Sequence, residues 1–270
     1  MTTGDSRPGP RPDPPVRWAA GTTFVPTPDG WLVHGPDEDF MVLEVPARDR
    51  EAVADLIAGR IGADAALARV PDAADLIAEL AVPRQEAVEV LLVGDGPLLA
   101  PLSRCLDRAG LIVRHGAAPD AATRVMVACA EHLPDAAWRE LDSRCRELGV
   151  AWHRGHAEGR RWYAGPFTPP SGEPGYEDVR LRRLAACPWP DELAAYWAFL
   201  DAGGRPATPP DPAGAEVAAA LIAADVRAWA DGAEPPSGAG NQVGIDLVAG
   251  EIRRHPVLPV PRGLMREVPV

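Results

Sequence analysis

The chain has 270 residues, of which 46% are hydrophobic, and a formal net charge of −12. The hydrophobic share excludes wholesale disorder, and the length allows one large domain or two small ones. The negative charge disfavours nucleic acids and anionic membranes as partners. All 27 basic residues are arginine, which excludes a P-loop lysine or a Schiff-base lysine.

The four cysteines lie far apart, with no CxxC pair, and predict reduced thiols rather than a disulfide framework or a zinc site. They are Cys105, Cys129, Cys145 and Cys187. No apolar run is long enough to span a membrane, and residues 1–16 lack the apolar centre of a signal peptide. We therefore expect a cytoplasmic protein that begins with a Pro-rich tail over residues 1–16.

Residues 17–84 predict three strands followed by three helices. The β-prone runs TTFVP and GWLVHG flank the turn PTPDG, and FMVLEV gives the third strand. Helical spacing then appears in REAVADLIAGRIG, and two shorter helices follow at 64–69 and 72–80, with Asp72 as the N-cap of the last. This order is typical of a small winged-helix-like module.

Residues 85–270 alternate strands with helices, which predicts a parallel sheet with crossover connections. A strand pair follows in VAWHRG and RRWYAGPF, then three helices, and the chain closes with a predicted hairpin in QVGIDLV and GEIRRHPVLPV. We expect an α/β fold in which an α+β N-terminal module precedes a Rossmann-like domain.

A glycine pair follows the first strand of this second domain, in VLLVGDGPLL. Gly94 and Gly96 fit the first two positions of the dinucleotide fingerprint GxGxxG, but Leu99 takes the third. The second strand ends without the carboxylate that binds the ribose. Asp95 also places a negative charge beside the helix N-terminus, where an anion would have to bind. Arg114 remains a candidate partner for a 2′-phosphate. We expect a vestigial loop and no bound cofactor.

Other candidate sites give weak signals. His153 and His156 resemble metal ligands, but no Cys, Asp or Glu lies at a usable spacing, so we expect surface histidines in a strand and turn, and no metal. Cys129 lies inside an apolar strand, as inert thiols usually do. GxSxG, HExxH and kinase motifs are missing. These residues argue against an enzyme.

Residues 17–84 also allow a winged-helix DNA reader. They hold six arginines against twelve acidic residues, and the predicted helix 72–80 carries no basic residue. DNA binding relies on basic groups that neutralise phosphates, so this interpretation is disfavoured. A peptide partner is not excluded, although an acidic peptide would have to bind mainly through apolar anchors.

Two segments carry a family resemblance. Tyr163–Pro190 resembles the segment after the central sheet in ThiF-like (ubiquitin-activating-enzyme-like) proteins of azole-forming peptide pathways, and IDLVAGEIRRHPVLPVPRGLM resembles their C-terminal strand pair. The matching positions are Gly165, Pro166, Pro174, Leu181, Arg182, Trp189 and Pro190. The family's four zinc cysteines fall on Gly175, Asp178, Gly263 and either Met265 or Arg266, so the resemblance implies no zinc here.

The module at 17–84 precedes this ThiF-like domain at 85–270 and resembles the recognition element of ribosomal peptide (RiPP) pathways. The resemblance implies that a leader peptide adds as a strand to the third strand, against the third helix. The peptide-binding residues would be Phe40, Met41, Val42, Leu43, Glu44, Val45, Leu76, Ile77 and Leu80. Core packing remains an alternative role for each of them.

The resemblance further implies a non-catalytic homodimer that presents the leader to a YcaO-type cyclodehydratase, which forms thiazolines or oxazolines in thiopeptide and related pathways. Two alternatives stay open. One is a residual adenylating or NADP-dependent enzyme that uses the Gly94–Gly96 loop. The other is a structural dimerisation partner.

Overall fold

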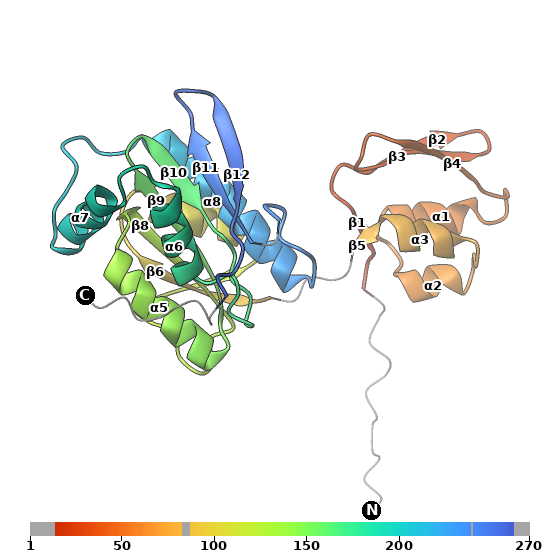
Figure 1. The fold of residues 1–270 in the computed structure, drawn as a ribbon. Coiled ribbons are helices and arrows are strands. Elements are labelled where there is room, and N and C mark those ends of the chain that lie inside the picture. Colours follow the sequence, from red (N-terminus) through yellow and green to blue (C-terminus); the bar gives the residue numbers. More distant parts are fainter. Residues whose placement is uncertain (1–13, 83–86, 239, 262–270) are drawn as a thin grey trace, which may run out of the picture. The chain divides into compact units, whose positions relative to one another are not determined.

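A computed structural model describes residues 14–82, 87–238 and 240–261. The chain divides into two compact units, Met1–Arg84 and Gln85–Val270, each with its own sheet and helices (Figure 1).

The first unit contains the three strands and three helices that the sequence predicts. The antiparallel sheet has the order β2-β3-β4, and its strands are β2 (Thr23–Thr27), β3 (Gly30–His34) and β4 (Phe40–Glu44). The helices are α1 (Arg50–Ile57), α2 (Ala63–Leu67) and α3 (Ala73–Leu80). A two-stranded sheet that the sequence analysis did not predict pairs β1 (Arg17–Trp18) with β5 (Ala81–Val82).

The core of this unit lies between one face of the sheet and the helices (Figure 1). Val33 of β3 is fully buried and packs with Leu76 and Leu80 of α3. Because side chains alternate along a strand, Met41 and Leu43 of β4 turn toward this core and are half-buried. The remaining side chains of β4 are exposed.

The module begins earlier than the sequence suggests. Pro15 forms a bridge with Gly62, and Val16 packs against the core cluster that includes Leu56. The expected tail therefore does not extend to residue 16, because these two residues already contact the helical part of the module; residues 1–13 lie outside the described part. Asp72 occupies the N-cap position of α3 as predicted, but its side chain accepts no capping hydrogen bond.

The second unit is built on a mixed seven-stranded sheet of order β12-β11-β10-β9-β8-β6-β7. β7, β6, β8 and β9 are parallel, and the pairs from β9 to β12 are antiparallel. The strands are β6 (Glu89–Gly94), β7 (Ile112–Gly116), β8 (Val125–His132), β9 (Ala151–Glu158), β10 (Arg161–Ala164), β11 (Asn241–Asp246) and β12 (Glu251–Pro256). The predicted α/β class is confirmed.

Helices cover both faces of this sheet (Figure 1). One face carries α4 (Leu99–Arg108) and α8 (Pro212–Ala230). The other carries α5 (Asp135–Leu148), α6 (Tyr176–Ala186) and α7 (Pro190–Asp201). Strands buried on both sides read as continuous apolar runs, as VLLV in β6 does. Among the described residues, no helix has the length and apolar character needed to cross a membrane.

The expectation that His153 and His156 are surface residues is wrong. Both lie in β9, which is flanked by strands on both sides and covered on both faces, and they are 0% and 2% exposed. The Nδ1 atom of His153 accepts the backbone N–H of Arg154, and Nε2 lies 2.9 Å from Asp225 Oδ2. Because Nδ1 of His153 accepts a hydrogen bond, Nε2 is the ring nitrogen that carries the proton and donates a hydrogen bond to Asp225 Oδ2.

Asp225 joins α8 to β9 and to a loop. Its carboxylate also accepts the Ser237 backbone N–H at 2.9 Å and the Ser237 hydroxyl at 2.6 Å. Burial acts to raise the pKa of Asp225, but the hydrogen bonds from His153 and Ser237 outweigh it, and the pKa lies below its ordinary value. The carboxylate therefore contributes stability above about pH 4, and this contribution is lost as the pH falls through the lowered pKa.

We predict that Asp225→Asn lowers the free energy of unfolding by about 3 kcal/mol, because an amide cannot accept all of these hydrogen bonds and one buried donor loses its partner. Urea unfolding at neutral pH measures the loss. Glu216→Gln, on the same helix as Asp225, is the matched control: it removes an exposed ion pair with Arg104 of α4 and should change the free energy of unfolding little. Equal effects of the two substitutions would contradict a structural role for Asp225.

Candidate functional site

The small sheet has one protected edge and one open edge. Among the described residues, β4 pairs only with β3, and β2 forms the opposite edge. β2 contains Pro26, which has no N–H to offer a further strand. Proline is one of the means by which natural sheets protect an edge. β4 has no proline, so it is the edge that can accept an added strand.

Two hydrogen bonds at the ends of β4 fix the direction of its backbone groups. The Val45 N–H donates to the Asp29 carbonyl, and the Asp39 carbonyl accepts the Gly35 N–H, both at 2.9 Å. Positions 39 and 45 therefore turn toward β3. Because this direction alternates along a strand, the residues whose N–H and C=O groups face the open edge are Phe40, Val42 and Glu44.

A small groove lies between the end of β4 and the start of α3. It contains a cavity of about 50 Å³. Its apolar lining comes from Leu43, Val45, Pro46, Val53, Val70, Ala73 and Leu76. Glu44 and Asp72 supply the charged part of the lining. A strand added to β4 would place every second side chain on the side of this groove.

The structure brings the predicted strand residues together as one edge. Phe40 and Val42 are each 68% exposed, Glu44 is exposed, and Val45 is buried at the end of the groove. The half-buried Met41 and Leu43 complete the set.

The predicted helix residues divide into two groups. Leu76 and Leu80 belong to the core, and Leu76 also lines the groove beside β4. Ile77 lines a different cavity, with Val16 and Ala81 among its neighbours. Successive helix residues are 100° apart, which explains why Ile77 leaves the side of α3 that Leu76 occupies. A charge introduced at Leu76 or Leu80 would test folding rather than peptide binding.

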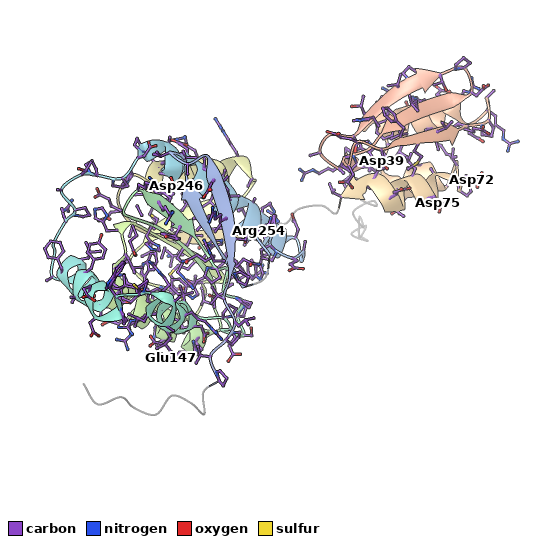
Figure 2. All side chains as sticks on the ribbon, turned by 45° about the horizontal axis from the view of Figure 1, so that its top comes forward. Asp39, Asp72, Asp75, Glu147, Asp246 and Arg254 are labelled. Atoms are coloured by element: carbon purple, nitrogen blue, oxygen red, sulfur yellow. The ribbon has the colours of Figure 1, made fainter. Side chains whose placement is uncertain are left out.

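Acidic side chains lie in and near the groove. Glu44 and Asp72 line it, Asp75 follows on α3, and Asp39 precedes the opposite end of β4 (Figure 2). Among the described residues, no ion pair of the module involves these four acids. The charge around the groove is therefore negative, and an acidic peptide would depend on backbone hydrogen bonds and apolar contacts for its affinity.

In the second unit, close packing accounts for both glycines of the Gly94–Gly96 loop. Gly94 has φ +111°, and a Cβ atom there would lie 1.8 Å from the Cys129 carbonyl oxygen. A Cβ atom at Gly96, where φ is +83°, would lie 3.0 Å from the Glu131 backbone nitrogen. The close approach of the end of β8 thus explains glycine at both positions, and no bound ligand is needed to explain it.

A larger cavity of about 670 Å³ lies beyond the carboxyl ends of β6 and β8. Open α/β sheets bind ligands in this place, and the volume is in the usual range of ligand sites. Its charged lining comes from Asp95, Glu131, His132, Glu140, Arg144 and Arg205. The three carboxylates outnumber the two arginines, a charge that suits a nucleoside triphosphate poorly.

The sequence does not reveal this cavity, because its walls come from segments far apart in the chain. Residues 93–95, 128–134 and 203–205 all contribute. The candidate phosphate partner Arg114 is not among the lining residues and instead donates to Glu89 Oε1 at 2.7 Å.

The cysteine positions of the resembled zinc site hold other groups. Gly175 is the N-cap of α6, and its N–H donates to Asp178 Oδ2 at 2.8 Å. Positions 263, 265 and 266 lie outside the described residues. Within the described ranges, no group of three His, Cys, Asp or Glu side chains is placed to hold a metal.

The candidate Cys129 has a thiol whose pKa is raised to about 12 by burial, with the charge of Asp95 adding to the effect.

No protein-family model matches the chain, and no curated protein matches its sequence. Solved structures do match its fold. A heterocyclase in complex with substrate and cofactor has a TM-score of 0.62 at 14% identity, over 91% of this chain and 38% of that one. The microcin C7 biosynthetic enzyme MccB, in complex with N-formylated MccA, has a TM-score of 0.54 at 14% identity, over 91% and 97% of the two chains.

The E. coli microcin synthetase McbBCD complex contains a chain with a TM-score of 0.52 at 12% identity, over 89% of this chain and 97% of that one. At these identities the likeness establishes the fold. This chain spans about two fifths of the length of the heterocyclase.

We predict that Gly94→Ala lowers the free energy of unfolding by about 2 kcal/mol or more, because the added Cβ meets the backbone of β8 in a left-handed conformation. Urea unfolding measures this loss of stability.

We also expect millimolar Mg-ATP or NADP to leave the melting temperature of the wild-type chain unchanged. A saturable increase that Gly96→Ala removes would contradict the structural account of the loop.

Proposed function

We propose that this chain binds the leader segment of a ribosomally made precursor peptide as a strand added to β4. The observation that carries the proposal is the open edge of β4 beside an apolar groove, in a sheet whose other edge contains Pro26. Backbone hydrogen bonds from Phe40, Val42 and Glu44 would supply affinity that is independent of sequence. Side chains that enter the groove would supply specificity.

The fold comparisons support a role in peptide modification. Among the matching proteins are a heterocyclase solved with its substrate, MccB solved with MccA, and a multi-subunit microcin synthetase. We infer that this chain serves an azole-forming pathway, with the precursor peptide and a YcaO-type cyclodehydratase as its partners. We further infer that it works as a homodimer, which light scattering on the purified chain tests directly.

We infer that the chain presents the peptide and leaves ring formation to the cyclodehydratase. Packing explains the Gly94–Gly96 loop without a phosphate, and carboxylates predominate in the cavity beside it. A nucleotide-dependent enzyme is the second candidate, favoured by the position and size of that cavity. Precursor peptide incubated with this chain and ATP, without cyclodehydratase, separates the two: an adenylated or dehydrated product in the mass spectrum would establish the enzyme.

We predict that Val42→Pro weakens binding of the fluorescently labelled leader peptide about tenfold or more in fluorescence polarisation. It removes one edge N–H, and its ring crowds the approaching strand. The Val42 side chain is exposed and its N–H faces away from β3, so the sheet should tolerate proline. Val42→Ala keeps the N–H and is the matched control, and proline should weaken binding more than alanine does. Unchanged binding by Val42→Pro would overturn the β4 site.

A further inference from the structure

The face of the small sheet that turns away from the helices carries a row of apolar side chains. Val25 of β2 lies opposite Leu32 of β3, and Leu32 lies opposite Val42 of β4. Val25 is 45% exposed, Val42 is 68% exposed, and Leu32 is half-buried. The row crosses all three strands and ends at β4.

An aromatic pair forms a second row on the same face. His34 of β3 lies opposite Phe40 of β4, and their ring centroids are 4.8 Å apart. Phe40 is 68% exposed. This row also ends on β4.

Both rows end at residues whose backbone groups face the open edge. A strand that pairs with Phe40 and Val42 therefore places its own side chains next to these two and extends both rows. Directly opposite side chains of neighbouring strands contact each other, and aromatic and β-branched residues pair most favourably. A polar side chain on the guest strand would cover Phe40 and Val42 but give them no apolar contact.

We infer that the peptide held at β4 is apolar on both faces of its strand. This inference rests on the proposed function and specifies its substrate class. The guest segment contains consecutive apolar residues, with alternate ones turned to the groove and to the outer rows. An amphipathic strand, apolar only on the groove side, would bind more weakly.

Val42→Thr tests the inference, because it keeps the N–H and the side-chain shape and exchanges one methyl group for a hydroxyl. We expect about a threefold loss of leader-peptide affinity in fluorescence polarisation, the size of one cross-strand pair. Val25→Thr makes the same change at the far end of the row, two strands from the guest, and should leave affinity unchanged.

Val42→Pro tells the possible failures apart. If Val42→Pro weakens binding while Val42→Thr binds like the wild type, the outer face has no role and the inference falls, but the β4 site stands. If the leader peptide binds the wild type, Val42→Thr and Val42→Pro equally well, or does not bind the wild type at all, the proposed function itself falls.

A separate observation in the second unit carries an independent inference. Arg154 of β9 is 1% exposed and lies over the ring of Trp152, 4.5 Å from the centroid. Its Nη1 donates to Thr168 Oγ1, but among the residues that the structure describes its Nε and Nη2 have no hydrogen-bond partner. Nε2 of the buried His156 has none either. Both side chains line one internal cavity of about 10 Å³.

The other two arginines that line this cavity are already paired. Arg180 lies 2.9 Å from Asp135 Oδ2, and Arg183 donates to Glu158 Oε2 at 2.8 Å. Burial lowers the pKa of Arg154 to about 10 against the opposing effect of nearby carboxylates, so its guanidinium stays charged at neutral pH. Burial, together with the charges of Arg183 and Arg154, holds the pKa of His156 well below its ordinary value.

Unpartnered buried donors carry a large desolvation cost, and native proteins usually satisfy them with ordered water. A volume of about 10 Å³ is close to the minimum for one water molecule. We propose that a single internal water occupies this cavity, accepts a hydrogen bond from Arg154 and forms another with the neutral His156 ring. Because the volume is this small, we expect a water molecule rather than a larger anion.

A crystal structure of the full chain at high resolution, grown in sodium bromide, tests this proposal. We expect one water peak within hydrogen-bond distance of both side chains and no bromide anomalous signal. A bromide peak in the cavity would identify an anion site, and an empty cavity would show that the donors remain unsatisfied. Either result would overturn the proposal.

Discussion

Unpaired backbone groups on β4 are the constraint on which this account depends. A strand at the end of a sheet leaves alternate N–H and C=O groups without a strand partner, and natural sheets usually protect such an edge. The module protects β2 with Pro26 and leaves Phe40, Val42 and Glu44 open on β4. An apolar groove borders the open edge on one side, and apolar rows reach it on the other. In the proposed function, a peptide strand would satisfy these backbone groups and cover both apolar surfaces at once.

In the second unit, a glycine pair that partly matches the dinucleotide fingerprint has a structural explanation. Gly94 and Gly96 are needed because the end of β8 approaches them, whether or not a phosphate binds. The cavity beside them has the position of a ligand site, but three carboxylates line it. The polar groups of the interior serve packing in the same way, since His153, Asp225 and Ser237 join β9, α8 and a loop. These features support the proposed role of the chain as a scaffold that presents a peptide.

The periodic segments could be predicted from the sequence, and the residue environments could not. FMVLEV and DAADLIAEL have clear strand and helix periods, and both elements are present as β4 and α3. The prediction that His153 and His156 are surface residues was wrong. It rested on their polar side chains, whereas their burial follows from the central position of β9, which only the strand order reveals. Ile77 was grouped with Leu76 although the helix turns it toward another cavity. The protected edge at Pro26 and the large cavity also depend on which strands are neighbours.

Hydrogen exchange of the β4 amides, followed by NMR on the full chain with and without leader peptide, tests the central claim most directly. The account predicts an alternating pattern. The outward-facing amides of Phe40, Val42 and Glu44 should gain protection on binding, while those of Met41 and Leu43, which already face β3, should change little. Uniform protection along β4, or protection confined to the second unit, would show that the peptide does not bind as a strand on this edge.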